Sequence, residues 1–266
     1  MTEETNTQVV PNSESPIDSC GCIERGRTGA PQRPTRFHGE LQDTTAPGWI
    51  RLLELVEEAA ADRREEFKPL VELTAEQRRQ VVTLPPTIAK LTAVKHLVLY
   101  RSNLVRIPPE IGAMRSLEEF TPYTSYRLHW FPYELTRCAN LRRSTVSTRA
   151  LYGNYKFRAP FPLLPAPADG RHGLGDLDPG VWGATAIRTC SVCDRRIEKS
   201  GDLRQVWISR WTSGADVLPL LVNACSAACV DALPVPANGY VPVPHSGGPG
   251  VEQPPAGRMP EWRAGG

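Results

Sequence analysis

The chain has 266 residues, which is enough for a sizeable core and predicts one or two domains. Its formal net charge of +2 does not favour general attraction to nucleic acid, and no apolar run approaches the ~20 residues that a membrane helix needs. The polar, acidic N-terminus lacks the apolar stretch of a secretory signal, so we expect a cytoplasmic protein, away from membranes, whose seven cysteines stay reduced.

The first 45 residues lack periodic apolar positions and are rich in Pro, Gly, Ser, Thr and charge, which predicts a disordered tail over residues 1–45. Cys20 and Cys22 stand in this tail as CGC. We interpret them as incidental, because no matching His or Cys pair lies nearby. A metal-binding or redox role is the alternative.

From residue 47 the apolar positions recur at helical spacing, at Trp49, Ile50, Leu53, Val56 and Ala60. The pattern predicts a helix that begins at Thr45 or at the Pro-Gly step 47–48 and ends by Phe67 or Lys68, before a proline. A short second helix is expected at about 74–80. The first helix is suited to cap an array of repeats, and an unrelated helix before a linker is the alternative.

Residues 84–151 contain three units at a spacing of 23 to 24 residues, which start at Leu84, Ile107 and Phe131. Each start is followed by proline, and two further apolar columns stay in phase: Ile88, Ile111 and Leu135; Val94, Leu117 and Leu141. This pattern resembles the leucine-rich repeat family, in the variety whose units carry an IPxxI segment. The resemblance implies an α/β fold in which residues 46–158 form a helical cap and a short solenoid of parallel strands with a concave outer surface.

The units depart from the family pattern towards the C-terminal side. Ser102 stands at the position of the usual turn asparagine, Pro122 replaces a strand leucine, and Ser144 takes a core position. Proline removes a donor from the strand ladder, so a bend or an edge is expected there. The solenoid should therefore be short, about three turns, and irregular at this end.

The outward positions of the units form columns that combine tyrosine with charges of both signs. We expect a protein-binding surface made of Lys95, His96, Tyr100, Glu119, Tyr123 and Arg143. Tyrosine and arginine commonly anchor protein interfaces. The alternative is that these residues are simply the solvated side of a small sheet.

His96 and His129 lack a nucleophile or carboxylate motif at a defined spacing, so we expect ordinary surface histidines and no catalytic residue.

Residues 159–184 form a Pro/Gly-rich connector that we expect to cover the end of the solenoid, and its GLGDLDPG segment is interpreted as a turn.

The strongest chemical signal follows the connector, in a module predicted over residues 185–235. Two cysteine pairs, Cys190/Cys193 and Cys225/Cys229, have the spacing of a tetrahedral site of four thiolates. Four unligated buried cysteines are the alternative.

Segments 204–211 and 216–222 between the pairs predict a two-stranded hairpin, and the second pair falls at a predicted helix start. This order resembles treble-clef zinc fingers, and the second pair is similar to that of the small FCS finger, although Ala224 replaces its phenylalanine. A closed set of four thiolates leaves no open position for water, so the expected Zn²⁺ is structural.

We therefore expect a non-enzymatic adaptor that binds a protein or peptide through the repeats. The alternative is a nucleic-acid-binding regulator whose finger contacts DNA or RNA. Such a finger would use the basic residues Arg188, Arg195, Arg196, Lys199, Arg204 and Arg210, with Trp207 and Trp211 for stacking.

Residues 236–266 lack a core-forming pattern and predict an extended or disordered tail, laid partly across the finger through Tyr240 and Val241.

Overall fold

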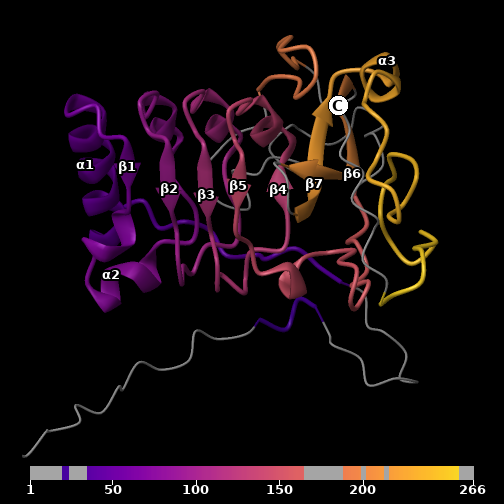
Figure 1. Ribbon diagram of the computed structural model, residues 1–266, viewed down its shortest axis with the longest axis horizontal. Coiled ribbons are helices and arrows are strands. Elements are labelled where there is room, and N and C mark those ends of the chain that lie inside the picture. Colours follow the sequence, from indigo (N-terminus) through magenta and orange to yellow (C-terminus); the bar gives the residue numbers. More distant parts are fainter. Residues whose placement is uncertain (1–19, 24–34, 165–187, 199–201, 213–215, 258–266) are drawn as a thin grey trace, which may run out of the picture.

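The computed structural model describes residues 20–23, 35–164, 188–198, 202–212 and 216–257. It shows a mixed α/β fold with a four-stranded parallel sheet, a three-stranded sheet and few helices (Figure 1). The predictions for residues 1–19, 24–34 and 258–266 lie outside the described residues, as do those for residues 165–187, Lys199 and the hairpin turn. Among the helices of the described segments, none is long and apolar enough to cross a membrane.

The parallel sheet is built from one short strand per unit, in the order β1 (Glu66–Phe67), β2 (His96–Val98), β3 (Glu119–Thr121) and β5 (Arg143–Ser144). The register pairs His96 with Glu119 and Glu119 with Arg143, as the sequence columns predicted. Backbone bonds such as Glu118 N–H to the Lys95 carbonyl (2.8 Å) continue the ladder beyond the strands. The spacing of 23 to 24 residues therefore places equivalent residues side by side.

Each unit also contains a 3₁₀ helix that begins after its proline: η2 (Pro86–Lys90), η3 (Pro109–Ala113) and η4 (Tyr133–Arg137). The preceding Pro85, Pro108 and Pro132 have extended backbones, and their fixed φ suits the entry into the helix. Gly112 lets η3 approach η4 closely, because a Cβ there would lie 2.7 Å from the Glu134 carbonyl oxygen. Further 3₁₀ turns are η1 (Pro69–Val71) and η5 (Thr148–Ala150).

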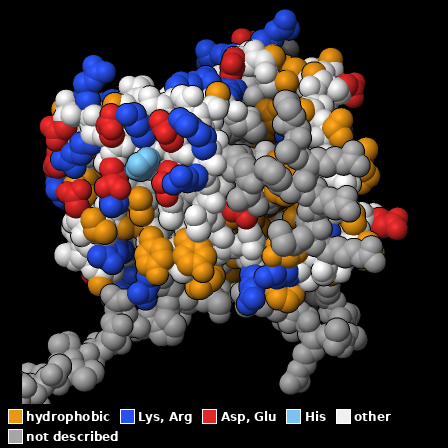
Figure 2. Space-filling view, in the orientation of Figure 1, with side chains coloured by type: hydrophobic (Ala, Val, Ile, Leu, Met, Phe, Trp, Pro, Cys, Tyr) orange, Lys and Arg blue, Asp and Glu red, His pale blue; other side chains and the backbone are white. Residues whose placement is uncertain are grey.

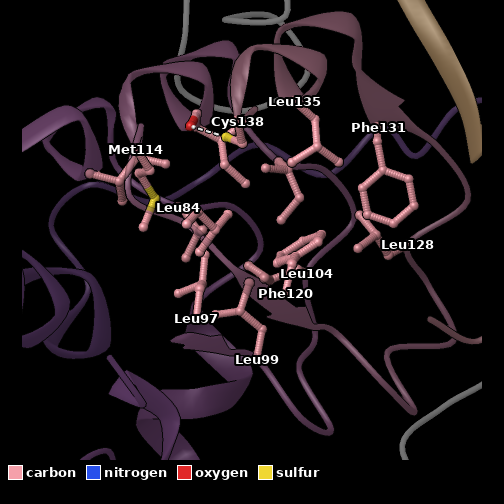
Figure 3. Close-up of a cluster of buried hydrophobic side chains, with 14 of the residues drawn as sticks. Leu84, Leu97, Leu99, Leu104, Met114, Phe120, Leu128, Phe131, Leu135 and Cys138 are labelled. Carbon is pink, nitrogen blue, oxygen red and sulfur yellow. Dashed lines mark hydrogen bonds between the residues drawn. The ribbon is translucent and has the colours of Figure 1, made fainter. Parts of the chain in front are cut away.

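The core lies between the strands and the 3₁₀ helices. Leu97 and Phe120 project into it from β2 and β3, and Ile111 and Leu135 from η3 and η4. Figure 3 shows side chains from successive units converging there, with the Cys138 thiol donating to the Ile111 carbonyl at 3.3 Å. Leu117 and Leu141 are also buried in this core, as their columns predicted.

The N-terminal helix α1 (Pro47–Ala61) lies beside β1 at one end of the sheet (Figure 1). The predicted C-terminal end at Phe67 or Lys68 is wrong. The helix stops at Ala61 because Arg63 turns into the left-handed region (φ 51°), and Phe67 then pairs with Leu97 as part of a first strand. The second helix, α2 (Ala75–Gln80), is confirmed, with a capping box between Thr74 and Gln77.

The irregular positions of the units have specific structural consequences. Pro122 follows the last residue of β3, so the missing donor coincides with the end of the strand. The Ser102 hydroxyl lies 2.6 Å from that of Ser125, which also donates to the Leu99 carbonyl at 3.1 Å. Two serines thus link the turns of neighbouring units. Ser144 is buried opposite Phe120.

The second sheet has the order β4-β7-β6, from β4 (Phe131–Pro132), β7 (Asp216–Ala224) and β6 (Arg204–Thr212). The predicted hairpin is confirmed, and β7 pairs in parallel with β4 of the third unit. Ile208, Leu220 and Val222 belong to the same buried cluster as Phe131 and Leu135. The hairpin therefore covers the C-terminal end of the repeats.

The first residues of the connector are partly packed against this end. Phe161 and Leu164 are buried in an adjoining cluster, whereas Leu163 is exposed.

Parts of both predicted tails pack onto this body. Residues 237–245 lie along β6, where Trp207 and His245 exchange backbone hydrogen bonds of 2.8 and 3.1 Å, and Tyr240 and Val241 are buried. Beyond them, Gly248 and Gly257 donate to the carbonyls of Phe161 and Tyr155. Residues 35–46 also contribute buried side chains such as His38 and Gln42, and the partly buried Phe37 stacks on Trp207 with centroids 5.6 Å apart. These segments depart from the predicted disorder because a few aromatic and imidazole groups bury without any periodic pattern.

Candidate metal centre and outer sheet surface

The two cysteine pairs converge on one point. The ligand atoms of Cys190, Cys193, Cys225 and Cys229 all lie within 4.8 Å of one another. Cys193 Sγ is 3.6 Å and Cys229 Sγ 3.7 Å from Cys225 Sγ. Sulfurs at the corners of a tetrahedron around Zn²⁺, with bonds of about 2.3 Å, would be about 3.8 Å apart. The spacing is thus compatible with a structural metal site.

The first pair sits on a tight turn. The backbone N–H groups of Val192 and Cys225 both point at Cys190 Sγ, at 3.4 Å. Asp194 adopts the left-handed conformation (φ 62°), and its N–H bonds to the Cys190 carbonyl at 3.1 Å, which folds the chain back. Donors aimed at a sulfur favour its thiolate form, the form that binds metal.

The second pair flanks the start of helix α3 (Ala227–Asp231), as predicted. Ser226 is the N-cap, and its hydroxyl oxygen accepts from the Cys229 N–H at 3.2 Å. Cys225 precedes the cap and Cys229 lies in the first turn, so both sulfurs are near the amide end of the helix. Cys190 is fully buried, whereas Cys193 is exposed, which places the site at the surface of the module.

The turn of the first pair is anchored to the third unit. Arg137, the last residue of η4, donates to the Ser191 carbonyl at 2.9 Å and forms an ion pair with Asp194. Asn223 of β7 and Ser191 exchange hydrogen bonds of 2.8 and 2.9 Å. The metal-ligand turn is therefore held by the hairpin and by the repeats together.

The chemistry of this donor set is compatible with a bound cation. Hydrogen bonding to Cys193 raises the pKa of the Cys225 thiol to about 12, with smaller contributions from desolvation, from hydrogen bonds to Cys229 and Cys190, and from electrostatic repulsion by Cys190. A divalent ion removes that repulsion and deprotonates the thiols. Four sulfur ligands complete a tetrahedral shell, so such an ion would stabilise the fold and leave no position for substrate.

The predicted protein-binding residues share the outer face of the parallel sheet. Tyr100 and Tyr123 stack with centroids 6.2 Å apart and an interplanar angle of 29°, while 49% and 46% of their surfaces stay exposed. His96 and Arg143 are exposed, Lys95 and Glu119 are half-buried, and the sheet register aligns His96, Glu119 and Arg143. The structure thus aligns His96, Glu119 and Arg143 across three strands and stacks Tyr100 on Tyr123.

Charges of both signs lie on the same part of the molecule as these tyrosines. Lys95 forms an ion pair with Glu65 at 2.6 Å, and Arg142 forms one with Glu118 at 3.3 Å. Figure 2 shows Lys, Arg, Asp and Glu side chains intermixed over the part of the molecule that contains β1, β2, β3 and β5, with hydrophobic side chains gathered below them. The surface is therefore mixed in charge, with an aromatic patch at its border.

Two expectations from the sequence are wrong, and one residue of the nucleic-acid alternative lies in the core. His129 is not a surface histidine: only 2% of it is exposed. Cys20 and Cys22 do have matching partners, because they meet His38 and His129 from distant parts of the chain. Trp207 is fully buried and its indole N–H donates to the Pro162 carbonyl at 3.0 Å, so it is not available for stacking on bases.

No protein-family model matches this chain, and no curated protein matches it either. The functional inference therefore rests on the residues and their geometry.

Proposed function

We propose that this chain is a non-enzymatic adaptor that binds a protein or peptide through the outer face of its parallel sheet. A zinc ion held by Cys190, Cys193, Cys225 and Cys229 would stabilise its C-terminal module. The observation that carries the proposal is the stacked, half-exposed pair Tyr100 and Tyr123 on a rigid backbone.

The aromatic pair has the properties of an interface anchor. Tyrosine offers a large contact area with few rotatable bonds, so little conformational entropy is lost when a partner covers it. Stacking already restricts both rings, and the turns that carry them, just beyond β2 and β3, are joined by the bond from the Arg101 N–H to the Tyr123 carbonyl at 3.0 Å. Neighbouring charges of both signs supply orientation and specificity more than affinity.

Two resemblances support the proposal. The in-register strands and the 3₁₀ helices after each proline fit a short leucine-rich repeat solenoid capped by α1, an architecture that presents one extended surface. The cysteine turn, hairpin and helix-borne second pair fit a treble-clef finger. Zinc is the ion we propose, because four thiolates in tetrahedral spacing suit it best.

The test is affinity capture from the lysate of the source cell, with proteins quantified by mass spectrometry. The intact chain is compared with Tyr100→Ala/Tyr123→Ala and with the control Val235→Ala/Val243→Ala, which removes exposed side chains outside the sheet. We expect the tyrosine variant to lose at least ten-fold of one or more specific proteins that the control retains. Equal capture by all three would contradict the proposal.

A nucleic-acid-binding role is the second candidate, favoured by the exposed Arg188, Arg195 and Arg196 around the first cysteine pair. Binding of this kind depends steeply on salt, because phosphate contacts release counterions. Heparin retention that collapses between low and moderate salt, and that Arg195→Ala/Arg196→Ala abolishes, would support this role over protein binding.

A further inference from the structure

Four side chains of metal-ligating types meet at a second point, outside the four-cysteine centre. Cys20, Cys22, His38 and His129 have ligand atoms that all lie within 4.8 Å of one another. His38 and His129 are 5% and 2% exposed, and Cys22 is also buried. Three chain segments separated by 16 to 109 residues thus bring two thiols and two imidazoles to one point.

Hydrogen bonds at the outer ring nitrogens determine the tautomers. His129 Nδ1 lies 2.6 Å from the Ala150 carbonyl oxygen, which can only accept, so Nδ1 carries the proton. His38 Nδ1 lies 3.0 Å from Glu40 Oε2, and the carboxylate likewise requires a proton on Nδ1. In the neutral rings both Nε2 atoms therefore present lone pairs to the inside of the cluster.

These two Nε2 atoms lie 3.2 Å apart, and Cys20 Sγ lies 2.9 Å from that of His129. The Cys20 thiol proton can serve one of the nitrogens, but the contact between the two lone pairs stays repulsive. A cation among the four atoms would make every one of these contacts favourable. Two imidazole nitrogens bound to one tetrahedral Zn²⁺ at about 2.0–2.1 Å would be about 3.3 Å apart, close to the observed distance.

The ligands are also oriented as metal ligands usually are, because a metal-binding His commonly donates its second N–H to a carboxylate or a backbone carbonyl. Glu40, which orients His38, is paired with Arg127. Arg106, itself buried, donates to the Glu40 carbonyl at 2.9 Å and to the His38 carbonyl at 3.3 Å. Two arginines of the repeats therefore hold the ligand-bearing segment in place.

We propose that Cys20, Cys22, His38 and His129 form a second, structural metal site for zinc. Two thiolates neutralise a divalent ion, which allows the site to be buried without net charge. Soft sulfur together with imidazole selects zinc over calcium or magnesium. The ion would bind the N-terminal segment to the third unit beside Phe37, Tyr152 and Trp207, which pack together next to the hairpin.

Zinc X-ray absorption of the intact chain tests this proposal without any variant. Two sites would bind two zinc ions with six sulfur and two nitrogen ligands in all, an average of about three sulfurs and one nitrogen per ion. One zinc per chain with sulfur ligands alone would overturn the proposal. So would a Cys20–Cys22 disulfide found by mass spectrometry in protein purified under reducing conditions.

Variants then assign the ion to its ligands. Cys20→Ser/Cys22→Ser should lower the zinc content from about two to about one per chain and leave a spectrum of four sulfurs. His129→Gln should also lose one zinc, whereas the exposed control His96→Gln should keep both. Cys225→Ser should remove the other ion and leave two sulfurs and two nitrogens on the remaining one. Retention of both zinc ions in His129→Gln, or in the double serine variant, would overturn the assignment.

Discussion

Arg137 and Asp194 form an ion pair of 2.5 Å that joins the end of η4 to the turn carrying the first metal-ligand pair. Asp194 is mostly exposed, so the charge–charge contact alone contributes little. The same guanidinium also donates to the Ser191 carbonyl at 2.9 Å, and this bond is partly buried. The backbone contact is therefore the stronger of the two links.

We expect Arg137→Ala to lower the free energy of unfolding by about 1–2 kcal/mol, because it leaves the Ser191 carbonyl without this donor. Asp194→Asn removes only the charge and suits the left-handed backbone, so its effect should stay within about 0.5 kcal/mol. Urea unfolding of both variants measures the difference. Equal losses would show that the ion pair, not the backbone bond, carries the link.

Metal removal provides the second prediction. Cys225→Ser should lower the zinc content by about one ion per chain and destabilise the hairpin, since ligand binding supplies folding free energy. Cys138→Ser makes the same chemical change at a buried cysteine outside both clusters, and should lose stability but no zinc. Metal analysis of the two purified variants checks this. Equal zinc contents would show that the four sulfurs do not share an ion.

The third prediction concerns the core shared by the hairpin and the repeats. Leu220 is fully buried and lies opposite Phe131 of the third unit. We expect Leu220→Ala to cost about 2–5 kcal/mol, whereas Leu163→Ala, at an exposed position, should change stability by less than about 0.5 kcal/mol. During unfolding, the circular dichroism signal and the release of zinc should change together, in a single cooperative transition. Two separated transitions would mean that the hairpin and the repeats unfold independently.

A dependence of stability on pH is expected from His245. Burial lowers its pKa to about 4; its Nδ1 accepts from the Gly247 N–H at 3.1 Å, and its ring packs edge-on against Phe161. The unfolded chain binds a proton near pH 6.5, but the folded chain does not until about pH 4, so stability falls as the pH drops through this window. The full loss amounts to about 3 kcal/mol, counted from above pH 6.5.

His245→Gln isolates this effect, because every other titrating group is the same in both proteins. The stability difference between the original chain and the variant should shrink or reverse as the pH falls from about 7 to about 4.5. Urea unfolding at each pH provides the measurement. A difference that stays constant over this range would refute the assignment.

The parts of the molecule that repeat or lie close together in sequence were predictable. The column through Val94, Leu117 and Leu141 is buried, and the register of His96, Glu119 and Arg143 follows from the repeat spacing of 23 to 24 residues. The cysteine pairs were recognisable because two ligands two or three residues apart leave a local signature. Such features need no knowledge of long-range contacts.

The missed features depend on single residues from distant segments. Strand β1 contributes one buried residue, Phe67, within a charged stretch, so no alternation marks it. His129 meets Cys20 across 109 residues and His38 across 91, which leaves no local spacing to detect. The useful signal would have been that two isolated histidines and a CGC pair together make a complete set of four ligands.

The strands of the two sheets form a row, and a segment that is not a repeat unit covers each end of it. Helix α1 lies next to β1 (Figure 1), and at the other end the C-terminal residues bond to the backbone of β6 through Trp207 and Ser209. Unprotected strand edges invite pairing with other chains. Another strand could therefore not pair beyond β6 without displacing the segment that bonds to Trp207 and Ser209.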